Sequence, residues 1–304
     1  YTFHTSDSAP YPVSTTYFNS AFAEGKAIDA GVHCDWPGTD HETLGLNGAP
    51  WVRRDLYVKK HIVAYEENSE YRRSNFYDTY ADLRAKQAQS SAFLYDKAGV
   101  MCEMFASAMW FASFKDLRNL AAWQFMQGVN FVVYQAYHIK LWGSTKHFAP
   151  LTFGPHSHIN FNLREFNDWV AETAYVCSQG KAKFDIALLD PTDAIWANRG
   201  DSAKELELAK RFNNVPNGYI ISDMKGIRRK ASKLKAVLNP GLPLTDEERA
   251  EIASLGLKLY EYEDADKIAK DIPCGISWNG DGKLMFMRRE LENGEELLIV
   301  ANIE

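Results

Sequence analysis

A strand–helix–strand unit over residues 99–138 constrains the fold of this chain more than any other stretch. Two short apolar segments, 99–105 and 130–137, flank a segment whose apolar residues recur at helical spacing. Ser113 is placed to cap this helix, with Asp116 three residues later in a partial capping box. A crossover helix of about a dozen residues between two buried strands implies parallel pairing with a right-handed connection. The unit therefore predicts a parallel α/β sheet.

Glu103 is the single carboxylate in the first of these apolar segments. Functional groups gather at the carboxyl ends of strands in parallel α/β sheets, and Glu103 falls at such an end. A lone acid inside an apolar strand is costly without a reason. We therefore expect Glu103 to be catalytic, with an ion pair to Arg or Lys at a helix end as the alternative. Tyr134, Gln135 and His138 close the second strand and are the expected substrate contacts, although His138 fits a structural role equally well.

A second acid-terminated run precedes the unit. The segment 31–36 (GVHCDW) repeats the order of GVMCEM: Gly-Val, then Cys, then an acid. If both runs are strand ends, Asp35 and Glu103 supply the two opposed carboxylates that glycoside hydrolysis requires, with Trp36 as a substrate contact. A surface loop is the alternative for Asp35 and for the polar residues that follow it.

Size, charge and composition narrow the class of protein. At 304 residues, 46% of them hydrophobic, the chain is long enough for two domains. A net charge of −6 argues against a nucleic-acid partner, and no apolar run reaches the ~18 residues of a membrane span. The chain starts at Tyr1 without Met or a signal-peptide pattern, so we expect a piece of a longer protein. Aromatic residues, 13% of the chain, fill cores or stack on sugar rings.

The irregular stretch 140–162 is long enough to favour a functional loop at an active-site mouth, with Trp142 as an expected substrate contact. It also contains His156 and His158, and neighbouring histidines can share a metal ion. Their turn-like surroundings and the lack of a partnering carboxylate pattern favour no metal site there.

The pattern changes after residue 180. Segment 184–189 (FDIALL) is a buried strand, and strands and helices then alternate to about residue 260. Thr245 and Glu248 form a full capping box for one of these helices. The alternation predicts a small flavodoxin-like parallel α/β domain, without the glycine-rich loop of a nucleotide site. Asn293-Gly294 marks a β-hairpin near the end of the chain.

These motifs, in this order, resemble a known family. The strand in CEMFASAMW precedes a KDLRNLAAW helix, a GVNFVVYQAYH strand and, later, FDIALLDP. They resemble the catalytic (β/α)8 (TIM) barrel and following α/β domain of large bacterial glycoside hydrolases. The nearest likeness is to α-L-rhamnosidases of glycoside hydrolase family 106, and family 42 β-galactosidases share the layout more distantly. The resemblance covers residues 95–304.

The resemblance implies three regions: an incomplete TIM barrel over 1–180, a flavodoxin-like domain over 181–273, and a hairpin over 274–304 that opens a β-rich module. It implies a glycosidase that cleaves a terminal sugar from a plant or bacterial oligo- or polysaccharide. Glu103 matches the family's strand-end acid, and Asp35 lies in a segment resembling its "H-D-W" element. Bound calcium (Ca2+), with ligands that cannot be mapped here, and a periplasmic or secreted location are further implications. The alternative is a non-catalytic carbohydrate-binding or scaffolding barrel, in which no acid faces Glu103.

Overall fold

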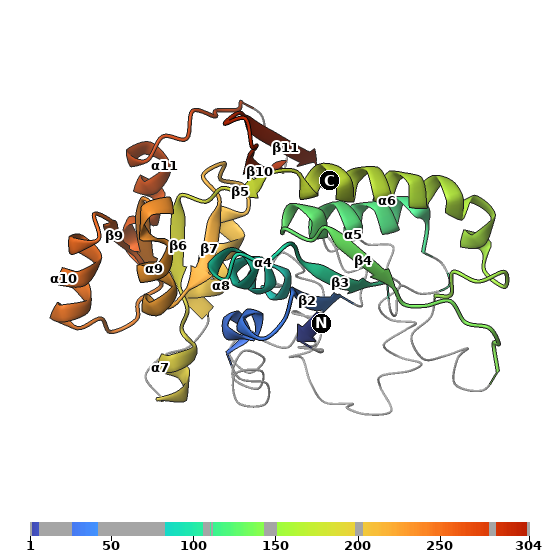
Figure 1. Ribbon diagram of the computed structural model, residues 1–304, viewed down its shortest axis with the longest axis horizontal. Coiled ribbons are helices and arrows are strands. Elements are labelled where there is room, and N and C mark those ends of the chain that lie inside the picture. Colours follow the sequence, from blue (N-terminus) through green and yellow to red (C-terminus); the bar gives the residue numbers. More distant parts are fainter. Residues whose placement is uncertain are drawn as a thin grey trace.

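The computed structural model describes a mixed α/β protein with two parallel sheets and one antiparallel sheet. Figure 1 shows two neighbouring groups of strands and helices. The first group contains the first parallel sheet, and the second group contains the other parallel sheet. No helix in the described part of the chain is both long enough and apolar enough to cross a membrane. The residues described are 2–5, 26–41, 83–105, 110, 112–142, 151–197, 203–279 and 284–302.

The first sheet contains four described strands, all parallel, in the order β1-β2-β3-β4. Each strand pairs with the next one along the chain, as in an arc of a TIM barrel. Within the described residues the sheet is an open arc. The strands are β1 (Thr2–Thr5), β2 (Trp36–His41), β3 (Met101–Met104) and β4 (Phe131–Tyr134).

The predicted strand–helix–strand unit is confirmed. Helix α5 (Phe114–Met126) connects β3 to β4, which are parallel. Its capping box is complete, because the Ser113 hydroxyl accepts from the Asp116 N–H and the Asp116 carboxylate accepts from the Ser113 N–H. Helices α4 (Arg84–Leu94) and α6 (Leu163–Ser178) belong to the same group, and the short helix η6 (His158–Asn162) leads into α6.

The second sheet confirms the predicted flavodoxin-like topology. Its four strands are parallel in the order β7-β6-β8-β9, which is the 2-1-3-4 order of that fold. Ile186 and Leu188 pack on one face and Ala187 and Leu189 on the other, so both faces are covered. The strands are β6 (Ile186–Leu189), β7 (Tyr219–Ser222), β8 (Ala236–Asn239) and β9 (Lys258–Glu261).

Helices and short turns of helix connect these strands. The predicted capping box at Thr245 and Glu248 is present. The helices are α7 (Thr192–Trp196), α8 (Ala203–Phe212), α9 (Met224–Lys230), α10 (Asp246–Ser254) and α11 (Ile268–Asp271), with the 3-10 turns η7 (Ala231–Lys233) and η8 (Tyr262–Lys267).

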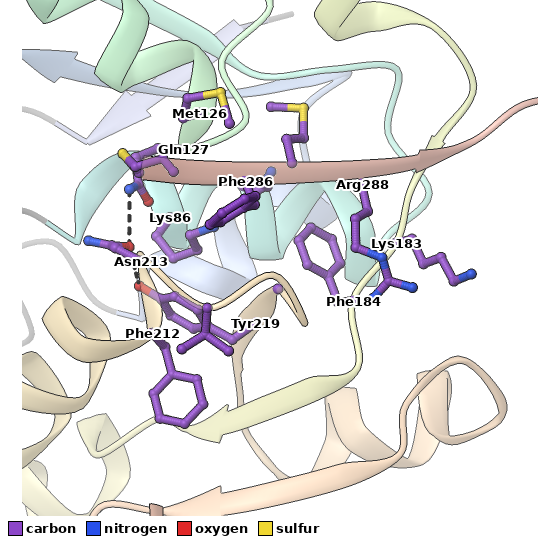
Figure 2. Close-up of a pocket in the computed structure, with 15 residues that line it drawn as sticks. Lys86, Met126, Gln127, Lys183, Phe184, Phe212, Asn213, Tyr219, Phe286 and Arg288 are labelled. Carbon is purple, nitrogen blue, oxygen red and sulfur yellow. Dashed lines mark hydrogen bonds between the residues drawn. The ribbon is translucent and has the colours of Figure 1, made fainter. Parts of the chain in front are cut away.

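Helix α4 joins the two groups, because it contacts both β2 and β7. β7 is an edge strand, and the Ser90 hydroxyl accepts a hydrogen bond of 2.8 Å from the Ile221 N–H on it. Ser91 binds the short helix η1 (Ala27–Val32) by donating to the Ile28 carbonyl and accepting from the Gly31 N–H. A pocket lies where α4, the second sheet and the terminal hairpin meet (Figure 2).

The predicted hairpin is formed by β10 (Leu284–Glu290) and β11 (Glu296–Asn302). It pairs with the two-residue strand β5 (Lys181–Ala182) and packs against α5. Its Met285 and Met287 side chains belong to the core of the first group.

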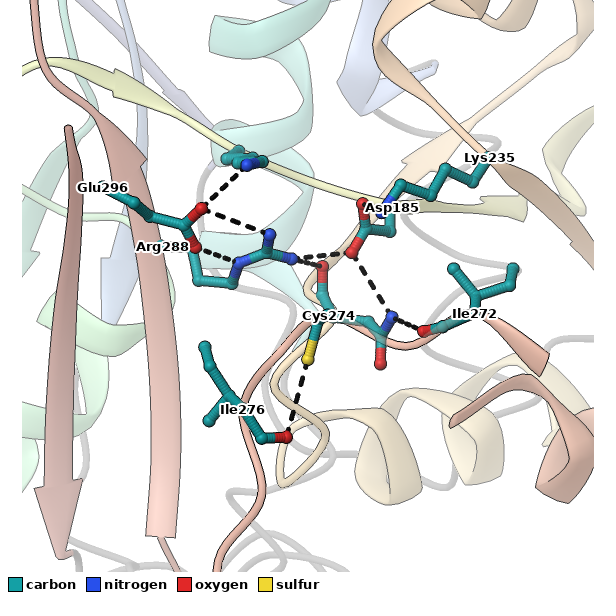
Figure 3. A network of polar contacts seen from close by, with 9 residues as sticks. Asp185, Lys235, Ile272, Cys274, Ile276, Arg288 and Glu296 are labelled. Atoms are coloured by element: carbon teal, nitrogen blue, oxygen red, sulfur yellow. Dashed lines mark hydrogen bonds and ion pairs between the residues drawn. The ribbon is translucent and has the colours of Figure 1, made fainter. Parts of the chain in front are cut away.

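A buried ion-pair network fixes the hairpin to the second sheet (Figure 3). Arg288 of β10 lies 2.6 Å from Asp185, which immediately precedes β6, and both side chains are buried. Lys235 binds the other oxygen of Asp185 at 2.9 Å, and Arg288 also binds Glu296 of β11 at 2.5 Å. The hairpin is therefore attached to both groups, by apolar packing on one side and by charge on the other.

Candidate functional site

The carboxyl ends of β2 and β3 place two acidic residues at the same level of the first sheet. Glu103 is the third residue of β3, and its register partner on β2 is Asp40. Neighbouring strands lie ~4.8 Å apart, so the two backbones are adjacent at this point. On the other side of β3, the register partner of Glu103 is Val133 of β4.

Glu103 belongs to the sheet face opposite the one that packs against α5. Cys102 and Met104 are fully buried in the core that also contains Leu117 and Leu120 of α5. Since side chains alternate along a strand, Glu103 lies on the opposite face. Its neighbour Val133 on that face is 41% exposed. Glu103 itself is half-buried.

Asp35 and Trp36 lie at the other end of β2. The strand begins at Trp36 and runs to His41, so Asp35 precedes it and is exposed. Asp35 is five residues before Asp40, which corresponds to ~16 Å along an extended strand. The structure therefore does not bring Asp35 and Glu103 together as a pair.

The segment after β4 presents Gln135 and His138 beside the carboxyl end of the sheet. The Gln135 N–H donates to the Met104 carbonyl, and the His138 N–H donates to the Thr152 hydroxyl at 3.0 Å. Gln135 Oε1 and His138 Nδ1 are enclosed, and neither has a hydrogen-bond partner among the described residues. Enclosed polar atoms cost free energy when unpaired, so these two atoms are candidate contacts for a polar ligand.

The predicted contacts Tyr134 and Trp142, and the neighbouring Tyr137, lie in two different environments. Tyr134 lies on the helix side of β4. The centroid of its ring is 4.8 Å from that of Phe153 and 5.2 Å from that of Phe105. Burial raises the pKa of the Tyr134 hydroxyl above its usual range. Tyr137 and Trp142, in contrast, are 62% and 75% exposed. The packing of Tyr134 favours a core role, whereas Tyr137 and Trp142 offer ring surface to a ligand.

The described residues contain no group of three His, Cys, Asp or Glu side chains arranged to hold a metal ion. His158 Nε2 lies 2.9 Å from the Ala112 carbonyl, which gives this ring a structural partner, and His156 is exposed. The residues described here do not fit a calcium site, and we derive no step through calcium.

A second polar cluster lies at the carboxyl ends of β6 and β7. Doubly wound folds bind ligands at such ends. Here the buried Lys26 ammonium lies 2.7 Å from Asp193 and 2.8 Å from Asp223. Burial alone would lower the pKa of Lys26, but these hydrogen bonds and the nearby charge of Asp190 raise it above its usual range. Lys26 therefore neutralises this cluster and ties η1 to the second sheet.

Comparisons with known proteins add two distant structural likenesses. No protein-family model and no curated protein matches the chain. A rhamnosidase from Novosphingobium sp. PP1Y is similar with 15% identity and a TM-score of 0.47, over 73% of this chain and 27% of that one. A catalytic mutant of Gan42B, a GH42 beta-galactosidase from G. stearothermophilus, is similar with 11% identity and a TM-score of 0.40, over 91% and 43%. This chain thus spans less than half the length of either protein.

The sequence analysis did not single out Asp40 or Lys26 as candidate site residues. Asp40 was hidden because its strand contains Pro37 and Gly38, which are typical of loops. No local signal in the sequence distinguishes a lysine that the fold will bury, such as Lys26. The sequence offered one signal for Asp40. It is an acidic residue within six residues of Asp35, where the strand beside the Glu103 strand was predicted to end.

Proposed function

We propose that this chain carries the acidic pair of a glycoside hydrolase, with Glu103 as general acid and Asp40 as the second carboxylate. The observation that carries the proposal is the parallel register of β2 and β3, which pairs Asp40 with Glu103 near the carboxyl ends of adjacent strands. Two carboxylates on opposite sides of a glycosidic bond are the common requirement of these enzymes. Asp35, which the sequence pattern offered for this role, is replaced by Asp40 in the proposal.

We propose a retaining reaction for this pair. Retaining enzymes use one carboxyl group as the acid and the other as the nucleophile. In the proposed reaction Glu103 protonates the glycosidic oxygen as its bond to the anomeric carbon breaks. Asp40 attacks that carbon to form a glycosyl ester. Water then hydrolyses the ester, with Glu103 accepting its proton.

A hydroxyl-rich ligand suits the surroundings of this pair. Sugar hydroxyls can donate to Gln135 Oε1 and pair with His138 Nδ1, the two enclosed atoms that have no partner among the described residues. The exposed rings of Tyr137 and Trp142 offer stacking surface for a pyranose. These contacts support an oligo- or polysaccharide substrate, and α-L-rhamnosides and β-galactosides are the first sugars to test.

The test is hydrolysis of aryl α-L-rhamnosides and β-galactosides by the wild-type chain and its variants. Glu103→Gln should lower kcat/KM at least ~10²-fold for poor leaving groups and much less for activated ones, because only a poor leaving group needs the proton. Asp40→Asn should lower the rate for both leaving groups. Asp168→Asn, on the exposed side of α6, is the control for a surface carboxylate and should leave the rate unchanged.

Three results would overturn the assignment. Equal rates for the wild-type chain and Glu103→Gln would remove the general acid. Loss of activity in Asp35→Asn but not in Asp40→Asn would show that the register pairing is not the catalytic pairing. Sugar binding by the wild-type chain without hydrolysis of any glycoside would favour the alternative, a carbohydrate-binding barrel, which the exposed rings of Tyr137 and Trp142 would also serve.

A further inference from the structure

Residues 151–154 brace the segment that follows β4, in which the candidate ligand contacts Gln135 and His138 lie. All four bracing residues are buried. The Gln135 N–H donates a hydrogen bond of 2.9 Å to the carbonyl of Met104, the residue that follows Glu103. The braced segment therefore leaves the sheet beside the carboxyl end of the Glu103 strand, and its position affects which groups a ligand at Glu103 can reach.

Thr152 is the central residue of this brace. It is fully buried, and its hydroxyl oxygen accepts two hydrogen bonds, from the His138 N–H at 3.0 Å and from the Gly154 N–H at 3.1 Å. The Phe153 N–H donates to the Ala136 carbonyl at 3.0 Å, so the brace holds the segment at two points. A threonine hydroxyl can accept both of these bonds, whereas an apolar side chain of similar shape can accept neither.

The brace and the segment are in close contact. A Cβ added at Gly154 would lie 3.0 Å from the His138 carbonyl oxygen and 3.3 Å from the Thr152 hydroxyl oxygen. On the other side of the brace, the Asn160 amide donates a hydrogen bond of 2.9 Å to the Phe153 carbonyl, and the Phe153 ring belongs to the core of the first group. The brace is thus fixed to the core on one side and holds the His138 backbone on the other.

We propose that Thr152 is a positioning residue for the glycosidase reaction and acts by fixing the backbone of His138. This inference rests on the proposed function, in which a sugar hydroxyl pairs with the enclosed Nδ1 atom of His138. The ring of His138 moves with its backbone, and misplacing a contact group by about 1 Å can cost on the order of 10² in rate. Without the Thr152 hydroxyl, the N–H groups of His138 and Gly154 lose their acceptor. An unpaired, buried N–H is costly, so the segment should shift toward other partners.

Thr152→Val tests this role, because valine has nearly the shape of threonine and lacks only the hydroxyl. In the glycoside hydrolysis assay, Thr152→Val should lower kcat/KM about tenfold or more. Thr152→Ser keeps the hydroxyl and should stay within about threefold of the wild-type value. Thr173→Val is the matched control and should leave kcat/KM unchanged, since the half-buried Thr173 hydroxyl donates to the Trp169 carbonyl of its own helix, α6.

A double-mutant cycle with His138→Ala separates positioning from a general loss of the fold. If Thr152 acts through His138, Thr152→Val should change kcat/KM by no more than about twofold when His138 is already alanine. A purely structural role would lower kcat/KM by the same factor in both backgrounds. If Thr152→Val does not fold, Gly154→Ala replaces it in the cycle, because its Cβ displaces the His138 carbonyl without removing a polar atom.

The proposed function and this inference fail in different ways. If the wild-type chain hydrolyses no glycoside, the proposed function fails and the positioning role falls with it. If the wild-type chain is active, a wild-type kcat/KM in Thr152→Val overturns the positioning role alone. Equal losses in the two backgrounds of the cycle, or a rate in Thr152→Ser as low as that of Thr152→Val, would have the same consequence.

Discussion

The contact between Arg288 and Asp185 gives the sharpest test of how the hairpin is held. Both side chains are almost fully buried, at 3% and 2% exposed, and Arg288 Nη1 lies 2.6 Å from Asp185 Oδ2. Removing one member of a buried ion pair costs ~3–5 kcal/mol, because the other charge is left without compensation. In Arg288→Met, Asp185 keeps Lys235 at 2.9 Å, so we expect a loss of about 2–4 kcal/mol in the free energy of unfolding.

A double-mutant cycle separates the pair from the rest of the network. Asp185→Asn alone should cost about 2–3 kcal/mol, since Arg288 keeps Glu296. The double variant should cost less than the sum of the single variants by ~1–2 kcal/mol, because neither charge is then left alone. The free energies are measured by urea unfolding at pH 7, followed by circular dichroism.

The surface pair of Arg228 and Glu251 is the matched control. Its side chains are 54% and 30% exposed, so Arg228→Met should lower the free energy of unfolding much less than Arg288→Met does. If Arg288→Met costs no more than Arg228→Met, the buried network does not hold the hairpin. Strict additivity of Arg288→Met and Asp185→Asn would refute the pairing itself.

Two further predictions concern acid stability and a tight turn. The hydrogen bond from Arg288 lowers the pKa of Glu296 to about 2, from 4.5, so Glu296 stabilises the fold above pH 4.5 and this contribution is lost as the pH falls toward 2. Glu296→Gln should reduce the loss of unfolding free energy between pH 6 and pH 2 by on the order of 1–2 kcal/mol, after solvent screening. Urea melts at pH values between 2 and 6 measure this loss, and an unchanged pH dependence would contradict the prediction. Gly180→Ala should destabilise by ~2 kcal/mol or more, because its backbone is left-handed (φ +62°) and a Cβ would lie 2.3 Å from the Glu290 carbonyl oxygen. Gly256→Ala, which is also left-handed (φ +74°) but has open space around it, should cost only ~1 kcal/mol when both variants are measured by urea unfolding at pH 7, and equal costs would refute the clash.

Much of the secondary structure could be predicted because its signals are local. The capping boxes of α5 and α10 and the Asn293-Gly294 turn each act within a few residues, and all three are present. The alternation of strands and helices after residue 180 also fixed the parallel topology, since a crossover of that length leaves few other arrangements.

The end of β2 could not be predicted from local signals. The run GVHCDW shares with GVMCEM the order Gly-Val, then Cys, then an acid, which suggested a strand ending in Asp35. In the structure the strand starts at Trp36 and includes Pro37 and Gly38, both poor strand formers. Pairing with β1 on one side and β3 on the other overrides these local preferences. The candidate site moved with the strand, from Asp35 to Asp40.

The groups that join the two halves of the molecule share a property that hides them in the sequence. Ser90 satisfies an edge N–H of β7 that lies 131 residues away, and Arg288 meets Asp185 across 103 residues. Each is a common polar residue whose role exists only once the partner is in place. A buried polar group costs more free energy when it is unpaired than it contributes when it is paired. Such contacts therefore disfavour incorrect assembly of the two halves more than they stabilise the correct one.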